Sequence, residues 1–327
     1  MRAIQITGFG PPEVLTVATV PDPTPAPGQV RVRIHAIGVN FSDTERRRAV
    51  FDPPELPWIP GREAAGMIDV VGEGVDPALV GARVAYYSRR PGGAYAELAT
   101  VAVDELLHFP DSVPFATMAA VPVQGLTAWG LVHFMAHVRP GDVVLLHAAA
   151  GGVGQLAVQL ARRAGARVLG TVSTDEKAEI ARAHGCAETI VYTREDVAAT
   201  VRELTDGEGV RVAYDSIGAT TYQSSLDSLR RRGLLVCFGT SSGPVPPINA
   251  MELAIKGSLF VTRPALADYI ADPAERAELA GELFDHVTSG RITIPINQRY
   301  ALEDAVQAHR DLEAGLTIGS SVFDLEC

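Results

Sequence analysis

The sequence predicts an α/β protein in which a doubly wound parallel sheet is combined with a second, β-rich domain. In the middle of the chain, short apolar runs alternate with helix-like segments, which is typical of buried parallel strands connected by helices. The first 120 residues instead read as short strands interrupted by glycines. The 327 residues exceed what one hydrophobic core usually organises, so we expect two domains.

Alternating patterns predict the strands of the β-rich part. Residues 30–34 alternate apolar and polar side chains, as a half-buried strand does. Residues 65–71 and 83–87 are further strand candidates. The proline-rich stretch at 21–28 predicts a stiff surface connection between strands.

Apolar runs and helical patterns predict the rest of the chain. The run at 143–146 reads as a buried strand, and a helix at 155–164 follows it and ends at Gly165. The alternation continues with strands at 167–172, 188–192, 210–215 and 234–238 and helices at 175–184, 194–204 and 221–229. The tail is predicted to contain helices at 273–289 and 303–313 and a strand at 321–324. We assign this tail to the β-rich domain, because the central sheet already has its set of strands.

Composition excludes several classes of protein. The formal net charge of -11 argues against binding to nucleic acid or to an anionic membrane, since both select basic surfaces. The first six residues read as a strand and not as a signal peptide, and no apolar stretch reaches the ~20 residues of a membrane span. Cys186, Cys237 and Cys327 form no C-x-x-C pair. We therefore expect a cytoplasmic protein without a disulfide framework or a four-cysteine zinc lobe.

A glycine-rich turn follows the strand at 143–146. A pyrophosphate must approach the backbone at the first turn of a helix, where free N–H groups and the helix dipole favour negative charge. Gly151 and Gly152 would allow that approach, Val153 lies between them and the next glycine, and Gly154 would let the helix pack closely. The first glycine of the usual G-x-G-x-x-G motif is Ala149 here. Such a turn can serve packing alone, but the strand–turn–helix context favours a dinucleotide site.

The end of the second strand favours NADPH over NADH. An NAD-selective site usually has a carboxylate at the tip of this strand, whereas this strand ends in Ser173 and Thr174. Lys177 follows one turn later, and Tyr192 ends the third strand. Hydroxyl groups and a lysine suit a 2′-phosphate, although residues 175–176 are acidic and argue for the opposite choice.

Several motifs in order along the chain resemble the quinone oxidoreductase family, the zinc-lacking branch of the medium-chain dehydrogenase/reductase superfamily. The similar segments are residues 10–15, 36–44, 61–66, 124–128, 147–154, 214–218, 231–233, 237–243 and 256–264. The resemblance implies a β-rich, GroES-like catalytic and substrate domain formed by residues 1–120 and 265–327. It also implies a Rossmann-type NADPH-binding domain at 121–264 and a homodimer.

The resemblance also bears on the metal. Zinc-dependent relatives have a cysteine where this chain has Asn40 and a histidine where it has Arg62. An amide and a guanidinium group are not zinc ligands, and Glu63 alone does not make a catalytic zinc site. We therefore expect no metal. Reduction of an activated double bond then needs only a hydride donor and stabilisation of the developing oxyanion.

The resemblance further implies individual site residues. Asn40 and Asp43 would lie at the nicotinamide end of the site, and Thr127 would follow the start of a helix there. These three are the candidate catalytic residues, and Asn40 and Thr127 are also candidate cofactor contacts. The other implied cofactor contacts are Ser216, Phe238, Gly239, Ser241, Val261, Thr262 and Arg263. Structural roles are the alternative: Asn40 in a turn, Phe238 at the end of a core strand and Arg263 beside a surface carboxylate.

Some positions depart from the family pattern and leave the proton donor open. Glu45 and Phe51 stand where several bacterial members have tyrosines, Gln124 replaces a lysine, and Gly315 replaces an arginine. The basic triplet at 46–48 reads as a solvated face, or alternatively as a receiver for an acidic substrate.

The sequence therefore predicts NADPH-dependent reduction of a quinone or an α,β-unsaturated carbonyl compound (an enone) without zinc. A dedicated enoyl reductase of a biosynthetic pathway and a non-catalytic NADPH-binding or redox-sensing protein are the alternatives.

Overall fold

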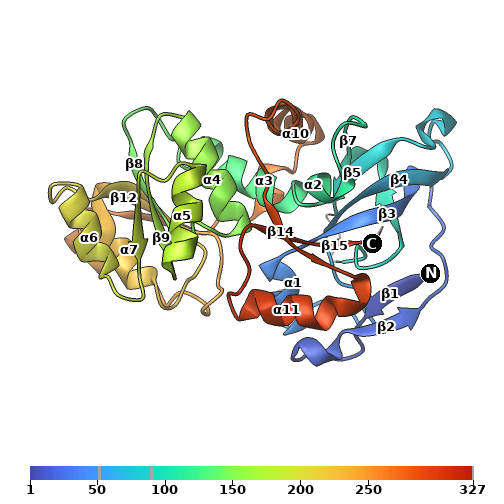
Figure 1. Ribbon diagram of the computed structural model, residues 1–327, viewed down its shortest axis with the longest axis horizontal. Coiled ribbons are helices and arrows are strands. Elements are labelled where there is room, and N and C mark those ends of the chain that lie inside the picture. The colour runs from blue at the N-terminus through green and yellow to red at the C-terminus, as the bar shows by residue number, and fades with distance from the viewer. Residues whose placement is uncertain (51–52, 89–91, 326–327) are drawn as a thin grey trace. The chain divides into compact units, whose positions relative to one another are not determined.

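The computed structural model describes residues 1–50, 53–88 and 92–325 (Figure 1). The chain divides into two compact units. The split unit consists of residues 1–126 and 270–327, and the central unit consists of residues 127–269. Among the described residues, no helix combines the length and the hydrophobicity that crossing a bilayer requires.

The central unit is built on a six-stranded parallel sheet. Its strands are β8 (Val143–Leu146), β9 (Arg167–Val172), β10 (Glu188–Val191), β11 (Val210–Asp215), β12 (Leu229–Cys237) and β13 (Phe260–Thr262). Their order is β10-β9-β8-β11-β12-β13, so the strand order reverses between β8 and β11. A reversal of this kind creates the crevice in which doubly wound sheets bind ligands.

Helices connect these strands. They are α3 (Pro122–Gly130), in which the chain passes into the central unit, the π-helix η4 (Leu131–Met135), α4 (Gly152–Arg163), α5 (Asp175–His184), α6 (Val197–Leu204), α7 (Tyr222–Ser228), α8 (Ala250–Ile255) and α9 (Leu266–Tyr269). Leu145 and Leu169 of the sheet pack with Val201 of α6 and Leu226 of α7 in one buried cluster. The doubly wound sheet domain predicted from the sequence is confirmed.

The split unit is β-rich. Its strands are β1 (Arg2–Gln5), β2 (Thr16–Thr19), β3 (Gln29–Val39), β4 (Glu63–Val71), β5 (Arg83–Tyr87), β6 (Leu98–Ala102), β7 (Leu106–His108), β14 (Ile296–Tyr300) and β15 (Ser320–Asp324). The larger sheet has the order β14-β15-β3-β4-β5-β7, with β6 also pairing with β3. Thus β15, from the end of the chain, lies beside β3 from its beginning.

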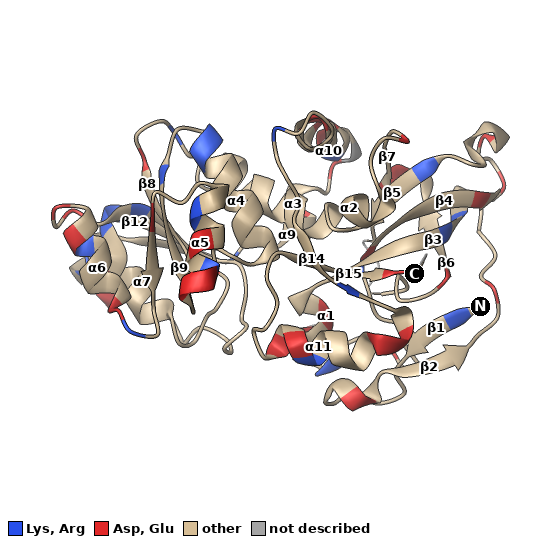
Figure 2. Ribbon diagram, in the orientation of Figure 1, with Lys and Arg blue, Asp and Glu red and all other residues tan. Residues whose placement is uncertain are grey.

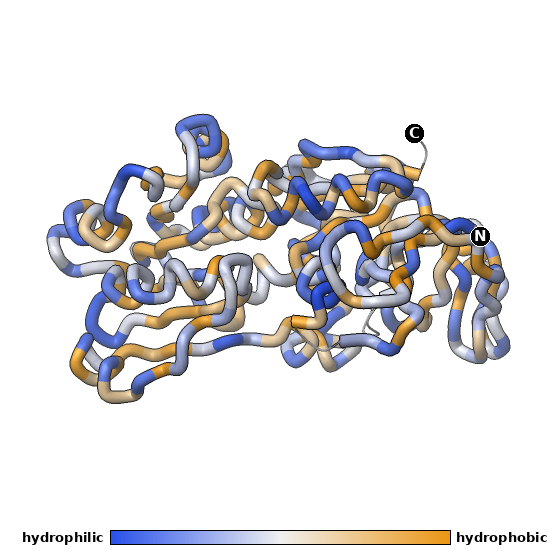
Figure 3. Tube along the Cα trace, turned by 90° about the horizontal axis from the view of Figure 1, so that it is seen from below, coloured by the Kyte–Doolittle hydropathy of each residue, from blue (hydrophilic) through white to orange (hydrophobic). Residues whose placement is uncertain are grey.

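Helices complete the split unit. They are α1 (Phe41–Arg47), α2 (Phe115–Ala119), α10 (Pro273–Thr288), α11 (Ala305–Glu313) and the 3-10 helices η1 (Pro12–Val14), η2 (Pro77–Leu79), η3 (Val103–Glu105) and η5 (Leu302–Asp304). As the alternating pattern predicted, Val30, Val32 and Ile34 of β3 are buried and join the core with Phe323 of β15. Figure 3 shows the alternation of hydrophobic and hydrophilic segments along the chain.

The structure corrects several predicted boundaries. α4 begins three residues earlier than predicted, at Gly152. α6 begins later, at Val197, because the Asp196 side chain accepts a hydrogen bond from Ala199 N at 2.9 Å and so caps the helix. β12 begins at Leu229, where the sequence predicted the end of a helix. The short elements α8, β13 and β14 were not predicted, because they carry no periodic pattern long enough to recognise.

Charge is distributed unequally between the two units. Arg and Lys residues divide equally, whereas 25 of the 39 acidic residues belong to the split unit (Figure 2). The net charge of -11 is therefore carried by the split unit, and the central unit is formally neutral. An anionic ligand of the central unit would meet no excess of negative charge there.

Candidate functional site

The predicted cofactor residues gather at one edge of the central sheet. Parallel strands present all their carboxyl ends at the same edge, which is where doubly wound sheets bind their ligands. The predicted residues that follow these strand ends are Gly151–Gly154 after β8, Ser173 and Thr174 after β9, Tyr192 after β10, Ser216 after β11, Phe238, Gly239 and Ser241 after β12, and Arg263 after β13. Val261 and Thr262 end β13 itself, and Thr127 is half-buried in α3.

The turn between β8 and α4 requires a glycine at position 154. Gly151 caps α4 with an extended backbone, and its own N–H donates to Ala148 O at 2.9 Å. A Cβ atom on Gly154 would lie 3.0 Å from the carbonyl carbon of Ala149 and closer still to Ala148 O. The first turn of α4 therefore packs directly on the preceding turn, as the sequence predicted for Gly154, although the contact is with the turn and not with the strand.

A buried polar chain fixes the base of this turn. His147 directly follows β8 and lies between the hydroxyl groups of Thr171 and Ser225, each 3.0 Å from one ring nitrogen. Ser225 Oγ donates to Asp215 Oδ2 at 2.7 Å, so it must accept from Nε2 of His147. Nε2 of His147 therefore carries a proton, and burial lowers the pKa of the ring, which favours its neutral form. This chain connects β8, β9, α7 and β11.

The ends of β11 and β12 approach each other closely. A Cβ atom on Gly239 would lie 2.9 Å from Ser216 Cα, so only glycine fits at this position. Ser241 N donates to Ser216 O at 3.3 Å, and Phe238 N donates to the carbonyl of Asp215 at 2.8 Å. The Arg263 guanidinium group donates to Gly239 O at 3.3 Å and contacts no carboxylate in the described interactions.

An arginine that was not predicted from the sequence pairs with Asp175, beside the predicted 2′-phosphate residues. Thr174 caps α5 by accepting from Lys177 N at 3.2 Å. Lys177 is half-buried, and burial lowers its pKa, whereas Tyr192 is 52% exposed. Arg194 holds both oxygens of Asp175 at 2.8 and 2.5 Å, and this ion pair lowers the pKa of Asp175. One of the two acidic residues that argued against NADPH is therefore neutralised by a partner 19 positions away.

In the split unit, Asn40 belongs to a buried chain of hydrogen bonds. Its Nδ2 donates to Glu63 Oε1 at 2.6 Å, and its Oδ1 accepts from Gln124 Nε2 at 3.3 Å. Gln124 Oε1 in turn accepts from Ser320 Oγ at 2.7 Å. The other oxygen of Glu63 accepts from Val123 N, in the first turn of α3, at 2.6 Å. Glu63 thus connects the Asn40 side chain to the start of α3.

Asp43 begins a second buried chain. Its Oδ2 accepts from Asn40 N and from the Tyr95 hydroxyl, both at 3.0 Å. Tyr95 also contacts Nε2 of His309 at 3.1 Å, and Arg47 Nη1 lies 3.0 Å from Nδ1 of that ring. Because a guanidinium group can only donate, Nδ1 must accept and Nε2 must carry the proton. Every proton in this chain is therefore directed toward Asp43, whose Oδ1 is buried without a hydrogen-bond partner.

Burial shifts the pKa of each titratable group in these two chains. Desolvation raises the pKa of Glu63 to about 8, although its bonds from Asn40 and Val123 oppose the shift. Desolvation likewise raises the pKa of Asp43 to about 6. Burial, with the nearby charge of Arg47, lowers the pKa of His309 to about 3, so this ring is neutral at physiological pH.

The basic triplet at 46–48 is not the solvated face that we predicted. Arg46 and Arg47 are 5% and 0% exposed. Arg47 binds His309, Glu313 Oε1 at 2.6 Å and Gly10 O at 3.1 Å. The prediction was wrong because Arg47 has carbonyl, imidazole and carboxylate partners from distant segments, which no local pattern reveals.

Arg62 and Asn40, which the resemblance aligns with zinc ligands of zinc-dependent relatives, make other contacts in this chain. Arg62 donates to Ser88 O at 3.2 Å and lies over the ring of Tyr87, 4.6 Å from its centroid. Asn40 is bound to Glu63 and Gln124. Within the described ranges 1–50, 53–88 and 92–325, no cluster of three His, Cys, Asp or Glu side chains could hold a metal ion.

Comparison with known proteins identifies the family. Residues 26–111 match the family described as alcohol dehydrogenase GroES-like domain, and residues 152–274 match the family described as zinc-binding dehydrogenase. A quinone oxidoreductase of Pseudomonas aeruginosa is 47% identical over 322 residues, which are 98% of this chain and 99% of that protein. The chain belongs to the quinone oxidoreductase family.

Other members of this family confirm the fold. The crystal structure of the Escherichia coli quinone oxidoreductase complexed with NADPH is 41% identical, with a TM-score of 0.96 over 99% of this chain and 100% of that one. A 2-haloacrylate reductase of Burkholderia sp. is 44% identical over 306 residues, 92% of each protein. The predicted family is confirmed, and so is the predicted combination of a Rossmann-type and a GroES-like domain.

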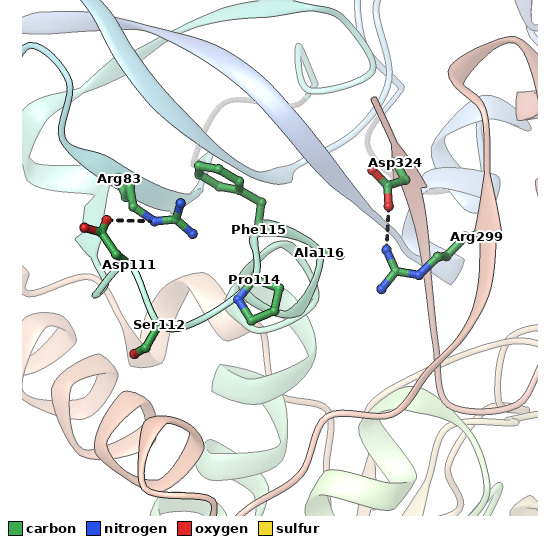
Figure 4. A pocket seen from close by; sticks show the side chains of 8 residues that line it. All are labelled: Arg83, Asp111, Ser112, Pro114, Phe115, Ala116, Arg299 and Asp324. Carbon is green, nitrogen blue, oxygen red and sulfur yellow. Dashed lines mark hydrogen bonds and ion pairs between the residues drawn. The ribbon is translucent and has the colours of Figure 1, made fainter. Parts of the chain in front are cut away.

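The split unit also has a pocket away from the predicted site residues (Figure 4). It measures about 360 Å³, and Arg83 and Arg299 line it from different strands. Each arginine already pairs with a carboxylate, Arg83 with Asp111 at 3.5 Å and Arg299 with Asp324 at 2.5 Å. No predicted site residue lines this pocket, so we do not assign the function to it.

Sequence reasoning missed several residues of the site. Tyr95 and His309 approach Asp43 from distant segments of the chain, and no spacing in the sequence announces such a contact. Glu63 was considered only as a metal ligand, and its bond to Asn40 was not predicted. Arg194 could have been found from the sequence, because it follows Tyr192 at the end of the third strand. Phe51 lies outside the described residues.

Proposed function

We propose that this chain transfers a hydride from NADPH to a quinone or an α,β-unsaturated carbonyl compound without zinc. The observation that carries the proposal is the bond between Asn40 Nδ2 and Glu63 Oε1 at 2.6 Å. Asn40 has an amide where the resemblance aligns a zinc-binding cysteine of zinc-dependent relatives. The carboxylate of Glu63 accepts hydrogen bonds from that amide and from Val123 N. An amide pairs with a carboxylate through hydrogen bonds and has little affinity for zinc.

The geometry of the central unit fits a dinucleotide. Gly151 leaves the backbone at the start of α4 open to a pyrophosphate, Gly154 lets the first turn of α4 pack on the preceding turn, and Gly239 lets the β11 and β12 ends approach closely. The NADPH complex of the Escherichia coli relative supports the same cofactor here. When bound, NADPH would supply the hydride. The residues proposed to hold it are Thr127, Gly151, Gly152, Val153, Gly154, Ser173, Thr174, Lys177, Tyr192, Ser216, Phe238, Gly239, Ser241, Val261, Thr262 and Arg263.

Selectivity for the 2′-phosphate rests on charge. Lys177 and Arg194 would supply cationic donors, and Arg194 also neutralises Asp175. Without that pairing, the carboxylate would repel the phosphate and favour a free ribose hydroxyl instead.

The split unit would stabilise the charge that develops on the acceptor. Asn40 uses one N–H on Glu63 and keeps a second N–H, which could donate to the carbonyl oxygen of a quinone or enone. Asp43 is 0% exposed and accepts from Asn40 N, so we propose that it positions Asn40 instead of touching the substrate. The final proton would come from solvent.

Reduction of a carbon–carbon double bond is the second candidate. The 2-haloacrylate reductase of Burkholderia sp. is nearly as similar to this chain as the first quinone oxidoreductase relative. Its name describes an activated alkene as the substrate, which favours an enone or a related acid as the acceptor for this chain.

The test is NADPH oxidation by metal-stripped protein with an ortho-quinone and with a simple enone, repeated with NADH. Turnover of either acceptor with NADPH supports the proposal, and the faster acceptor gives the substrate class. Tight NADPH binding without turnover of either acceptor would overturn it and favour a dedicated pathway substrate or a binding role. Restoration of activity only by zinc would contradict zinc independence.

We also propose a homodimer that forms through the outer edge of β13. This strand is the last in the sheet order, and Phe260 on it is 60% exposed. Met251 and Ile255 of α8, which precede β13 in sequence, are 65% and 78% exposed. Exposed strand edges with apolar side chains favour pairing with another chain.

A further inference from the structure

The buried chain of hydrogen bonds through Asn40 has a definite direction. Ser320 Oγ donates to Gln124, Gln124 Nε2 donates to Asn40, and Asn40 Nδ2 donates to Glu63. Glu63 ends the chain and must accept, which an ionised carboxylate does. All four side chains are buried, with exposed fractions between 0% and 6%, so water does not substitute for these bonds.

The same side chains can form the chain in the opposite direction. If Glu63 carries a proton, its O–H can donate to Asn40 Oδ1 after the amide turns over. Asn40 Nδ2 then donates to Gln124 Oε1, and Gln124 Nε2 donates to Ser320 Oγ. A hydroxyl group both donates and accepts, so Ser320 can end the chain in either direction. No atom except the amide groups has to move.

We propose that a single proton on Glu63 selects the direction of this chain and thereby decides whether Asn40 presents its N–H or its oxygen to the substrate. This inference deepens the proposed function and rests on it for the role of Asn40. Turning the amide exchanges donor and acceptor at the positions that remain free for a ligand. The carbonyl oxygen of the substrate would then face the Asn40 oxygen at the place where it had faced an N–H donor.

The surroundings of Glu63 make both protonation states accessible. Its neighbour on β5 is Tyr87, and Asp43 is the nearby carboxylate that raises the pKa of Glu63. Arg62 lies over Tyr87 and binds Ser88, while Val123 N faces the second oxygen. A Cβ atom on Gly38 would lie 2.5 Å from Ala119 O and closer to Glu63 Oε1, so the carboxylate is tightly enclosed. This burial places the pKa of Glu63 at about 8, within the physiological range.

Glu63→Gln mimics the protonated state by geometry alone. Val123 N always donates, so the oxygen of the introduced amide must face Val123 and its NH₂ group must face Asn40. Two NH₂ groups cannot hydrogen bond to each other, and the Asn40 amide is therefore forced to turn over. The variant keeps the shape of the side chain and locks the reversed direction.

The first experiment compares the pH profiles of kcat/KM for NADPH-dependent reduction in the wild type and in Glu63→Gln. Above the range in which Asp43 titrates, we expect the wild type to pass through one titration, near pH 8, between two plateaus that differ about tenfold, the value of one lost hydrogen bond. Glu63→Gln should show no such titration and should run at the rate of the wild-type acidic plateau. Glu105→Gln, which removes another buried carboxylate of the split unit, should retain the wild-type profile.

A double variant separates direction from folding damage. In Glu63→Gln with Gln124→Glu, the carboxylate stands at the other side of Asn40, where it accepts from Asn40 Nδ2 and Ser320 Oγ. The chain is then complete but reversed, so the rate should stay at the level of Glu63→Gln. Recovery of the wild-type rate would overturn the proposal, because it would show that a satisfied chain suffices in either direction.

Infrared difference spectroscopy tests the switch without turnover. Acidification of the wild type through pH 8, above the pKa of about 6 of the buried Asp43, should produce the carboxyl band of protonated Glu63 together with a change in side-chain amide bands, and Glu63→Gln should show neither. Absence of both changes in the wild type would overturn the proposal. If the wild type oxidises no NADPH with either acceptor while the infrared changes occur, the proposed function fails and the proton-controlled chain remains.

Discussion

Arg194 holds both carboxylate oxygens of Asp175, at 2.8 and 2.5 Å, beside the start of α5. Asp175 follows the strand end where an NAD-selective site places its carboxylate, so this ion pair bears directly on the choice of cofactor. Both side chains are exposed, and the pair therefore matters through local charge and contributes little to stability.

We predict that Arg194→Ala weakens NADPH binding on the order of tenfold and leaves NADH binding unchanged or stronger, because the variant loses one phosphate donor and frees Asp175. Fluorescence titration with each cofactor measures this effect. In Asp175→Ala/Arg194→Ala, the repulsive carboxylate is also absent, so part of the NADPH affinity should return. Equal losses for NADPH and NADH would contradict the assignment of Arg194 to the 2′-phosphate.

Gly154→Ala should destabilise the protein by about 1–3 kcal/mol and abolish cofactor binding, because the new Cβ would collide with the carbonyl groups of Ala148 and Ala149. The matched control is Gly281→Ala, inside α10, where a Cβ would meet nothing within 4 Å. That control should be neutral or stabilise by about 0.5–1 kcal/mol, the difference in helix propensity. Chemical denaturation and NADPH titration of both variants are the measurements, and equal behaviour would contradict close packing at Gly154.

The element pattern of the central unit was predictable from the sequence because each element there follows a local rule. A buried parallel strand is an apolar run, and the helix that follows it has its own period, so β8, β9 and β11 were found within one residue of their bounds. Likewise, the glycines of the turn at 151–154 were recognised because the need for an open backbone is a local property. The predicted site residues there share one sheet edge as a consequence of parallel topology alone.

The contacts of the split unit were not predictable in the same way. Asp43, Tyr95 and His309 come from three distant segments, and their contacts join residues 52 and 214 positions apart. A sequence pattern cannot distinguish a buried Arg47 from a solvated one, because its burial depends on partners in α11. The error in the basic triplet and the omission of His309 thus have the same cause.

We predict that His309 stabilises the fold because its neutral ring accepts a hydrogen bond from Arg47 and donates one to Tyr95. His309→Phe leaves Arg47 Nη1 and the Tyr95 hydroxyl without this partner, and we expect a loss of about 1–3 kcal/mol in the free energy of unfolding. His309→Gln can accept from Arg47 and donate to Tyr95, so it should retain most of the stability. His108→Gln, an exposed histidine on β7, is the control and should change nothing measurable. Equal losses in the Phe and Gln variants would contradict the assigned bonds.

The depressed pKa of His309 predicts the direction of its pH effect. Its folded pKa of about 3 lies below the ordinary value of 6.5, so the unfolded state binds the extra proton first. The contribution of His309 to stability is complete above pH 6.5 and is lost as the pH falls toward 3, by about 1.4 kcal/mol per pH unit. Urea denaturation of the wild type and His309→Gln across this range should show the difference, and parallel curves would contradict it.

Glu63 predicts a pH effect of the opposite sign. Its pKa is raised from 4.5 to about 8 in the folded state, so the native protein binds more protons than the unfolded chain between these values. The contribution of Glu63 is fully present below pH 4.5 and is lost as the pH rises through 8. Relative to Glu63→Gln, the wild type should lose up to about 1.4 kcal/mol per pH unit in this window. If the free energies of unfolding of the wild type and Glu63→Gln differ by the same amount at every pH in this window, the carboxylate of Glu63 is ionised in the folded state throughout it.

The outer edge of β13 predicts how the protein assembles. Phe260→Asp places a charge on the exposed edge strand and should weaken self-association at least about tenfold, because an unpaired carboxylate would have to lose its water in a paired edge. Sedimentation velocity over a range of protein concentrations measures the dissociation constant. Leu316→Asp is the matched control, since Leu316 is 68% exposed but belongs to the split unit, and it should leave association unchanged. A wild-type protein that stays monomeric at high concentration, or a control that dissociates as readily as Phe260→Asp, would exclude this edge as the dimer interface.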